Sequence, residues 1–126
     1  MRILLDTHIL LWQMADDPRL SADIRTILGN PNHAKIVSDV SLWEVAVKIR
    51  TGKLTVDIAA IEQEIRYNEY ERLAILRRHI VRLVDVPVIH RDPFDHLLIA
   101  QAQAEGLAVL TLDRKFRDYP VVLAFT

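Results

Sequence analysis

Four acidic residues have positions and neighbours that suit metal-assisted chemistry: Asp6, Glu44, Asp95 and Asp113. Each also has a simple structural explanation. Asp6 and Asp113 can cap the turns or helices that follow them, and Asp95 can complement a helix dipole. Glu44 can pair with Lys48, which lies one helical turn later. The function of these acids therefore depends on the elements that position them.

The segment from residue 90 to 116 predicts a turn, a helix, a stop at Gly106, a buried strand and a second turn. Pro93 suits the first helical position, which makes Asp92 the N-cap and places Asp95 in the first turn. At 3.6 residues per turn, Asp95 shares its helix face with three apolar residues, Leu98, Ile99 and Ala102. We therefore expect Asp95 at the rim of a buried core.

Short apolar strands alternate with helices along the chain. The expected strands are residues 2–5, 35–38, 108–111 and 121–123, with 73–76 as a short strand or extended segment. The expected helices are residues 7–15, 22–28, 40–51, 57–68 and 79–84, and the helix that ends at Gly106. This alternation predicts a three-layer α/β/α sandwich with a mainly parallel central sheet. The length of 126 residues predicts one domain, spanning residues 1–126.

Composition excludes several classes of function. The chain has no cysteine, which excludes disulfides, thiolate metal sites and cysteine nucleophiles and fits a cytoplasmic location. The net charge of −1 gives no global attraction to nucleic acid, so any such contact must come from local basic patches. No apolar run has the length of a membrane span, and the N-terminal segment lacks the cleavage site of a signal peptide.

The topology rule for parallel sheets brings the acids together, because sites form beyond the carboxyl ends of the strands. Asp6 follows the first strand, Asp113 follows the strand at 108–111, and Asp95 starts a helix at the same edge. Glu44 lies in a narrow polar stripe on a helix that is otherwise strongly apolar. We therefore expect a carboxylate cluster close to the core.

Such a cluster requires a cation, because neighbouring carboxylates repel and would otherwise become protonated. Oxygen ligands favour a hard divalent ion, Mg²⁺ or Mn²⁺. The chemistry that fits this pocket is hydrolysis of a phosphodiester by metal-activated water.

Over nearly its whole length, the chain resembles the PIN-domain ribonucleases, specifically the VapC toxins of type II toxin–antitoxin systems. Four segments carry this resemblance: LLDTHILLW, SLWEVAVKIRTGKL, RDPFDHLLIAQA and TLDRKF. It implies that the acidic quartet of the family falls on Asp6, Glu44, Asp95 and Asp113, with Asp6 and Asp95 as the firmest metal ligands. It also implies supporting roles, in which Thr7 and Thr111 orient ligands or water and Asp92 acts as a cap beside the ligands.

The resemblance further implies a function and partners. These are metal-dependent endonucleolytic cleavage of RNA, inhibition of translation, neutralisation by a cognate VapB-type antitoxin, and assembly as a homodimer. Candidate contacts to RNA phosphates are the basic residues near the acids, Lys48, Arg50, Lys53, Arg91, Arg114 and Lys115.

Other features receive simpler interpretations. We interpret Trp12 and Trp43 as core residues rather than base-stacking platforms, because both lie in apolar helical patterns. The five histidines lack the HxxxH and HExxH spacings, so a zinc site is not expected. We expect the early helices and the face formed by Ile58, Ile61 and Ile65 to supply apolar surface for a dimer or an antitoxin.

Two alternatives remain at the level of sequence. A receiver-type regulatory module would need paired acids after the first strand and a lysine after a late strand, whereas only Asp6 follows the first strand. A PIN-like fold without catalysis, acting only in protein binding, is disfavoured by the complete acidic quartet.

Overall fold

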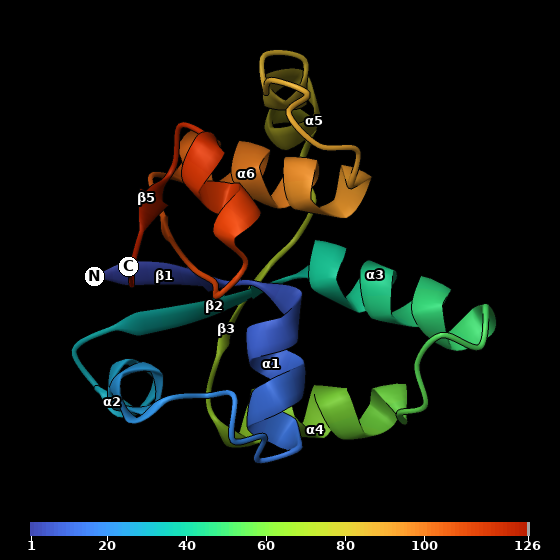
Figure 1. Ribbon diagram of the computed structural model, residues 1–126, viewed down its shortest axis with the longest axis vertical. Helices are drawn as coiled ribbons and strands as arrows, with labels where there is room; N and C mark the ends of the chain where they lie inside the picture. Colours follow the sequence, from blue (N-terminus) through green and yellow to red (C-terminus); the bar gives the residue numbers. More distant parts are fainter. Residues whose placement is uncertain (126) are drawn as a thin grey trace.

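A five-stranded sheet forms the centre of the protein in the computed structural model, which describes residues 1–125 (Figure 1). The strands are β1 (Arg2–Leu5), β2 (Ala34–Ser38), β3 (Glu71–Leu73), β4 (Ala108–Leu110) and β5 (Val122–Leu123). Their order is β3-β2-β1-β4-β5, and every pair is parallel. The predicted α/β/α sandwich with a parallel sheet is confirmed.

Both faces of the sheet are covered, which explains why the central strands are apolar without alternation. In β1, Ile3 and Leu5 join the core on one face, whereas Leu4 joins the core on the other. In β2, Val37 joins the first of these cores and Ile36 joins the second.

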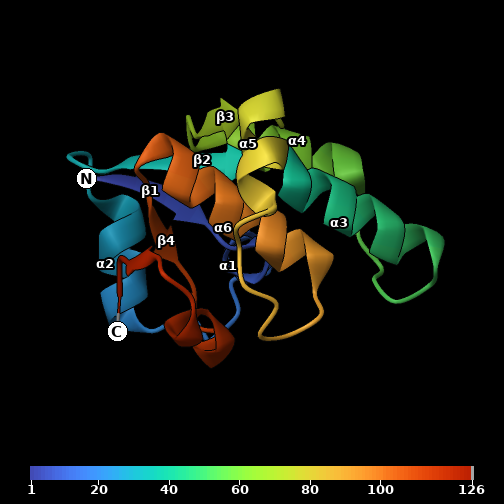
Figure 2. The same ribbon diagram turned by 90° about the horizontal axis from the view of Figure 1, so that it is seen from above.

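The helices are α1 (Thr7–Met14), α2 (Ala22–Gly29), α3 (Asp39–Arg50), α4 (Ile58–Tyr67), α5 (Arg77–Leu83) and α6 (Pro93–Glu105). Helices α1, α2 and α4 cover one face, and α6 covers the other with α5 packed on its outer side (Figures 1 and 2). Helix α3 contributes Val45 to the first core and Val40 to the second, and it lies beside the start of α6 at the carboxyl edge of the sheet. A 3₁₀ helix, η1 (Arg114–Asp118), follows β4. Within residues 1–125, no helix is both long and apolar enough to cross a membrane.

Most predicted elements lie within one or two residues of the observed ones, and the exception is the edge strand β3. It occupies Glu71–Leu73 rather than residues 73–76. The first two residues of β3, Glu71 and Arg72, are exposed and charged, so an apolar run could not reveal the strand.

The interpretation of Trp43 as a core residue is wrong. Its side chain is 49% exposed and packs edge-to-face against Phe94. Helix α3 runs outward from the sheet, so its outer side has no covering layer (Figure 1). Trp12 is partly buried, with the Arg19 guanidinium 4.3 Å from its ring centroid.

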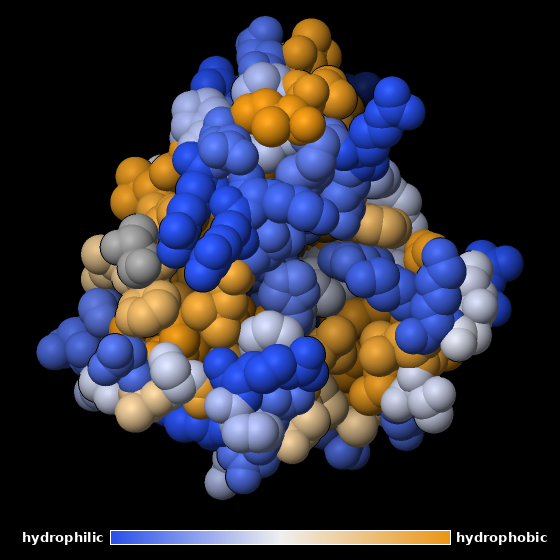
Figure 3. Space-filling view, in the orientation of Figure 1, coloured by the Kyte–Doolittle hydropathy of each residue, from blue (hydrophilic) through white to orange (hydrophobic). Residues whose placement is uncertain are grey.

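The expected apolar surface on α4 is also largely absent, because Ile61 and Ile65 are buried in the core and only Ile58 is exposed. Exposed apolar side chains gather instead on α5 and the segment after it; they are Ile80, Val81, Val84, Val88 and Ile89. Figure 3 shows apolar side chains at the surface at this end of the molecule, at the top of the view. We call these five residues the α5 patch.

Candidate active site at the carboxyl edge

Asp6 is fixed in position by the elements on both sides of it. It follows β1 and caps α1, where its Oδ1 accepts a hydrogen bond of 2.7 Å from the Thr7 backbone N–H. The Thr111 hydroxyl donates to its Oδ2, also at 2.7 Å. The Asp6 backbone N–H donates to the Leu110 carbonyl at the end of β4. The carboxylate is buried and is held between the ends of two adjacent strands.

Glu44 reaches the same edge from the second turn of α3. Its Oε1 lies 2.7 Å from the Thr7 hydroxyl, which is also 2.9 Å from the Ser41 hydroxyl. Its Oε2 accepts a hydrogen bond of 2.7 Å from Lys48 Nζ. Ser41 and Glu44 are buried, so the polar stripe on α3 faces the other acids rather than solvent.

Asp95 differs from Asp6 and Glu44 because its carboxyl group is buried without a donor. The backbone N–H groups of Phe94 and Asp95 both donate to Asp92 Oδ1, which fixes the start of α6. Across residues 1–125, no group donates a hydrogen bond to the Asp95 carboxyl, and His90 Nε2 lies 3.8 Å from its Oδ2.

Burial, followed by the negative charges of four neighbouring acids, raises the pKa of Asp95 to about 8. The four are Asp6, Asp92, Glu44 and Asp113. At neutral pH this carboxyl therefore keeps its proton unless a positive charge enters the cluster.

Asp113 lies at the more open side of the cluster. It caps η1, where its Oδ1 accepts from the Lys115 backbone N–H at 3.0 Å. Its own backbone N–H donates to the Thr111 hydroxyl at 2.9 Å. Because that hydroxyl also donates to Asp6, Thr111 connects the two acids.

Two basic side chains already contact the cluster. His8 Nε2 lies 2.9 Å from Asp6 Oδ2, and this hydrogen bond raises the pKa of His8 against the opposing effect of burial. Burial acts to lower the pKa of Lys48, but the hydrogen bond to Glu44 and the nearby acids leave it above its usual value. In both contacts the neighbouring acids favour the protonated form of the basic group and so raise its pKa.

Sequence reasoning missed His8. The available signal was its place two residues after Asp6 in the segment DTH, one turn before Trp12 on α1. The His8 ring lies over Trp12, with a centroid distance of 5.4 Å. A search for zinc spacings could not find it, because its partner is a carboxylate.

The donor chemistry of the cluster fits a hard divalent cation. The acids offer only oxygen atoms, and the uncompensated Asp95 carboxyl would regain its charge beside a cation. Over the part of the chain that the structure describes, no three Asp, Glu, His or Cys side chains already surround one point at ligand spacing. Side chains must therefore rotate before a metal can bind. The first to move are His8 and Lys48, which now contact the carboxylates of Asp6 and Glu44.

The candidate phosphate contacts are divided between near and remote positions. Lys48 contacts Glu44, and Arg114 and Lys115 follow Asp113 directly on η1. Arg91 is exposed just before α6. Arg50 is the last residue of α3, about 9 Å along the helix from Glu44, and Lys53 lies in the turn that follows.

The fold and this edge define a class of protein: an α/β/α sandwich with a carboxylate cluster at the carboxyl edge of a parallel sheet. The chain belongs to the PIN domain family, whose model matches residues 3–122. The predicted PIN-like fold is therefore confirmed. A comparison with curated proteins gave no match.

Solved structures of toxin–antitoxin complexes share the fold. VapBC2 from Rickettsia felis, bound to a DNA fragment from its promoter, aligns with a TM-score of 0.74 and 16% identity, covering 98% of this chain and 96% of that one. A toxin–antitoxin complex from Klebsiella pneumoniae gives a TM-score of 0.66 and 19% identity, covering 97% and 96%. DNA-bound VapBC from Salmonella typhimurium gives a TM-score of 0.65 and 19% identity, covering 98% and 96%.

Proposed function

We propose that the protein is a metal-dependent endoribonuclease and the toxin component of a type II toxin–antitoxin system. The observation that carries the nuclease proposal is the buried Asp95 carboxyl, which has no donor and feels the negative charge of four other acids. Membership of the PIN domain family and the shared fold with VapBC complexes support the same conclusion.

The metal ligands in this proposal are Asp6, Glu44, Asp95 and Asp113, with Asp6 and Asp95 as the firmest. A bound Mg²⁺ or Mn²⁺ would supply positive charge for the phosphate and make water a better nucleophile. Thr111 fixes Asp6, and Thr7 contacts Glu44, so both threonines orient the ligands. Asp92 holds the first turn of α6 and thereby the position of Asp95.

The first test is cleavage of a mixed pool of structured RNA by purified protein with Mg²⁺, Mn²⁺ or EDTA. Asp6→Asn and Asp95→Asn should remove a cleavage activity that requires the metal. Asp85→Asn is the matched control, because Asp85 is exposed and lies outside the cluster. If wild type and both cluster variants cleave alike, the acids are structural and the protein-binding alternative replaces the nuclease.

The toxin proposal adds a VapB-type antitoxin, a homodimer and a cytoplasmic location. The α5 patch is the surface we propose for contacts between proteins, since Val81 and Val84 are 70% and 83% exposed. Light scattering of wild type and Val84→Lys tests the dimer. Tyr67→Lys on α4 is the control, because Tyr67 is 84% exposed outside this patch. A wild-type monomer at high concentration would contradict the dimer.

The receiver-type alternative fits the structure poorly. Asp6 is the single acid directly after β1, and the described chain continues after β4 and β5 with Thr111 and Ala124 rather than lysine.

A further inference from the structure

A small pocket of about 190 Å³ lies between the end of β4, η1 and the end of the described chain. Its polar lining includes Thr111, Asp113, Arg114 and Arg117, and its apolar lining includes Leu123 and Phe125. We call it the arginine pocket. Its volume is below the roughly 300–1,000 Å³ of pockets that enclose a drug-sized ligand, so it can hold part of a nucleotide while the rest stays in solvent.

The arginine pocket is continuous with the acidic cluster. Thr111 lines the pocket and donates a hydrogen bond to Asp6, which is buried in the cluster. Asp113 also belongs to both, because it lines the pocket and its charge acts on Asp95. A strand whose phosphate lies at the acids therefore has this pocket directly beside it.

The 3₁₀ helix η1 carries three basic side chains close together, directly after Asp113 of the acidic cluster. Arg114, Lys115 and Arg117 fall within four consecutive residues and are exposed. Among residues 1–125, Arg114 and Arg117 have no ion-pair partner. Five arginines elsewhere are paired with carboxylates; they are Arg2, Arg19, Arg25, Arg72 and Arg78.

Unpaired guanidinium groups beside an acidic cluster can bind the phosphates of RNA. The acids repel a polyanion, whereas a guanidinium offers a planar set of donors that matches phosphate oxygens. Leu123 and Phe125 add partly buried apolar surface on which a base can pack.

We propose that the arginine pocket binds the nucleotide next to the scissile phosphate of single-stranded RNA. Arg114 and Arg117 hold its phosphate, and its base packs against Leu123 and Phe125. The strand must be single because bases in an RNA duplex are stacked and cannot enter a pocket. This inference rests on the proposed nuclease function, and it assigns a specific role to Arg117 beside the candidate contact Arg114.

The test measures binding of a fluorescein-labelled single-stranded RNA of about 12 nucleotides by anisotropy. Asp95→Asn serves as the background, so that the RNA is not cut. In that background Arg114→Gln combined with Arg117→Gln should raise Kd at least 10-fold. The slope of log Kd against log salt should fall by about 0.7 for each phosphate that the variant no longer neutralises.

Arg66→Gln is the matched control, because Arg66 is exposed on α4 and has no ion-pair partner within residues 1–125. It should change Kd less than 2-fold. Arg117→Lys should restore part of the affinity, since it keeps the charge. In the protein that retains Asp95, Arg117→Gln should raise KM and leave kcat unchanged. This is the pattern expected when a residue binds the substrate and the transition state equally.

A second pair of measurements tests the base. Phe125→Ala should weaken binding of the RNA about 5-fold, in line with the removal of one stacking surface. It should not change binding of an abasic strand of the same length. Equal weakening on both strands would overturn the assignment of the base to this pocket.

The outcomes separate this inference from the proposed function. If wild type cleaves RNA and the double arginine variant binds like Arg66→Gln, the inference fails while the nuclease stands. If wild type neither cleaves nor binds RNA, both fail.

Discussion

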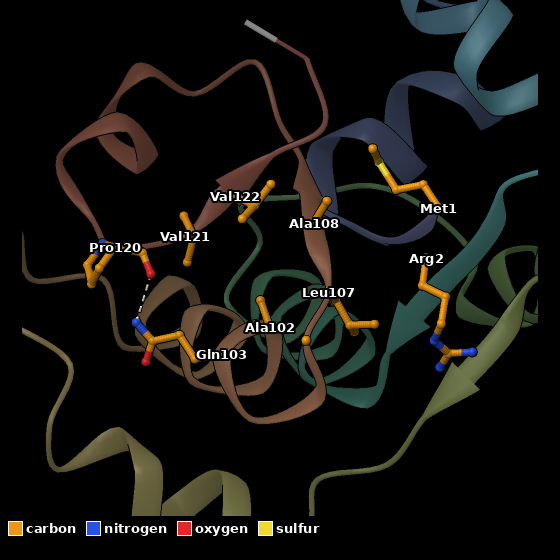
Figure 4. Close-up of a pocket in the computed structure, with 10 residues that line it drawn as sticks. Met1, Arg2, Ala102, Gln103, Leu107, Ala108, Pro120, Val121 and Val122 are labelled. Carbon is orange, nitrogen blue, oxygen red and sulfur yellow. Dashed lines mark hydrogen bonds between the residues drawn. The ribbon is translucent and has the colours of Figure 1, made fainter.

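The two edges of the sheet are built from the same strands but differ in chemistry. At the carboxyl edge, Asp6 and Thr111 follow β1 and β4 and meet in a buried hydrogen-bonded cluster. At the amino edge, the starts of β1, β4 and β5 surround a pocket of about 370 Å³ lined mainly by apolar side chains (Figure 4). The polar groups there have partners: Gln103 donates to the Pro120 carbonyl and Arg2 pairs with Glu71.

The difference follows from the direction of the chain. In this parallel sheet α1, α3 and α6 begin at the carboxyl edge, where each start requires a polar cap and presents the positive end of its dipole. At the amino edge α6 ends and strands begin, so no caps of this kind are needed. The pocket at the amino edge is larger than the arginine pocket but has no converging acids. Converging polar groups therefore identify the candidate site better than pocket size.

The largest expected effect is loss of catalysis at the carboxyl edge. Asp95→Asn should lower the rate of RNA cleavage at least about 1,000-fold, equivalent to about 4 kcal/mol of transition-state stabilisation. Single-turnover cleavage with saturating Mg²⁺ measures this. Asp85→Asn should retain the wild-type rate, and a similar loss in that control would show a global rather than local effect.

The second effect is a pH dependence of stability that arises at the same edge. Without metal, folded Asp95 keeps its proton up to about pH 8, whereas the unfolded chain loses it near the ordinary pKa of 3.8. The folded state binds more protons across this range, so the free energy of unfolding falls as pH rises from about 4 to about 8. One proton contributes at most about 1.4 kcal/mol per pH unit. His8 acts in the same direction, because its raised pKa gives stability that is lost as pH rises through that pKa.

Urea unfolding in EDTA at pH 5, 6, 7 and 8 checks this dependence. Asp95→Asn should give a shallower slope and a more stable protein than wild type at pH 8. Added Mg²⁺ should stabilise wild type more at pH 8 than at pH 6. Equal slopes in wild type and Asp95→Asn would show that the carboxyl is already ionised in the folded protein.

A smaller effect concerns the link between Asp6 and Asp113. Thr111→Val removes the hydroxyl that donates to Asp6 Oδ2 and accepts from the Asp113 N–H. We expect about a 10-fold loss of Mg²⁺ affinity, which is typical when a group that orients a ligand is removed. Calorimetric titration measures it, and Thr111→Ser should retain most of the affinity. Unchanged Mg²⁺ binding in Thr111→Val would show that this hydroxyl does not support the metal site.

The smallest effect is expected at the amino edge. Val122 lines the pocket there and is 66% exposed. Val122→Thr should change the free energy of unfolding by less than about 0.5 kcal/mol and leave RNA cleavage unchanged. If Val122→Thr lost as much cleavage as Thr111→Val, catalysis would not be confined to the carboxyl edge.

The sequence was sufficient to predict elements whose causes are local. The N-caps at Asp6, Ser21 and Asp92 and the stop at Gly106 depend on residues within one helical turn. The continuous apolar run of β1 similarly predicts a strand covered on both faces. The predicted position of β3 differs from the observed one. This strand is defined by its pairing with β2, whereas the prediction depends on an apolar run.

For the candidate site, the sequence determined which residue types were available and, through the topology rule, which edge would hold Asp6, Asp95 and Asp113. Only the tertiary structure decided how they interact. The Thr7 hydroxyl meets Glu44 across 37 positions of the chain, and the Thr111 hydroxyl meets Asp6 across 105. The raised pKa of Asp95 depends on burial and on charges brought in by three other segments, and such sums cannot be read from spacing along a chain.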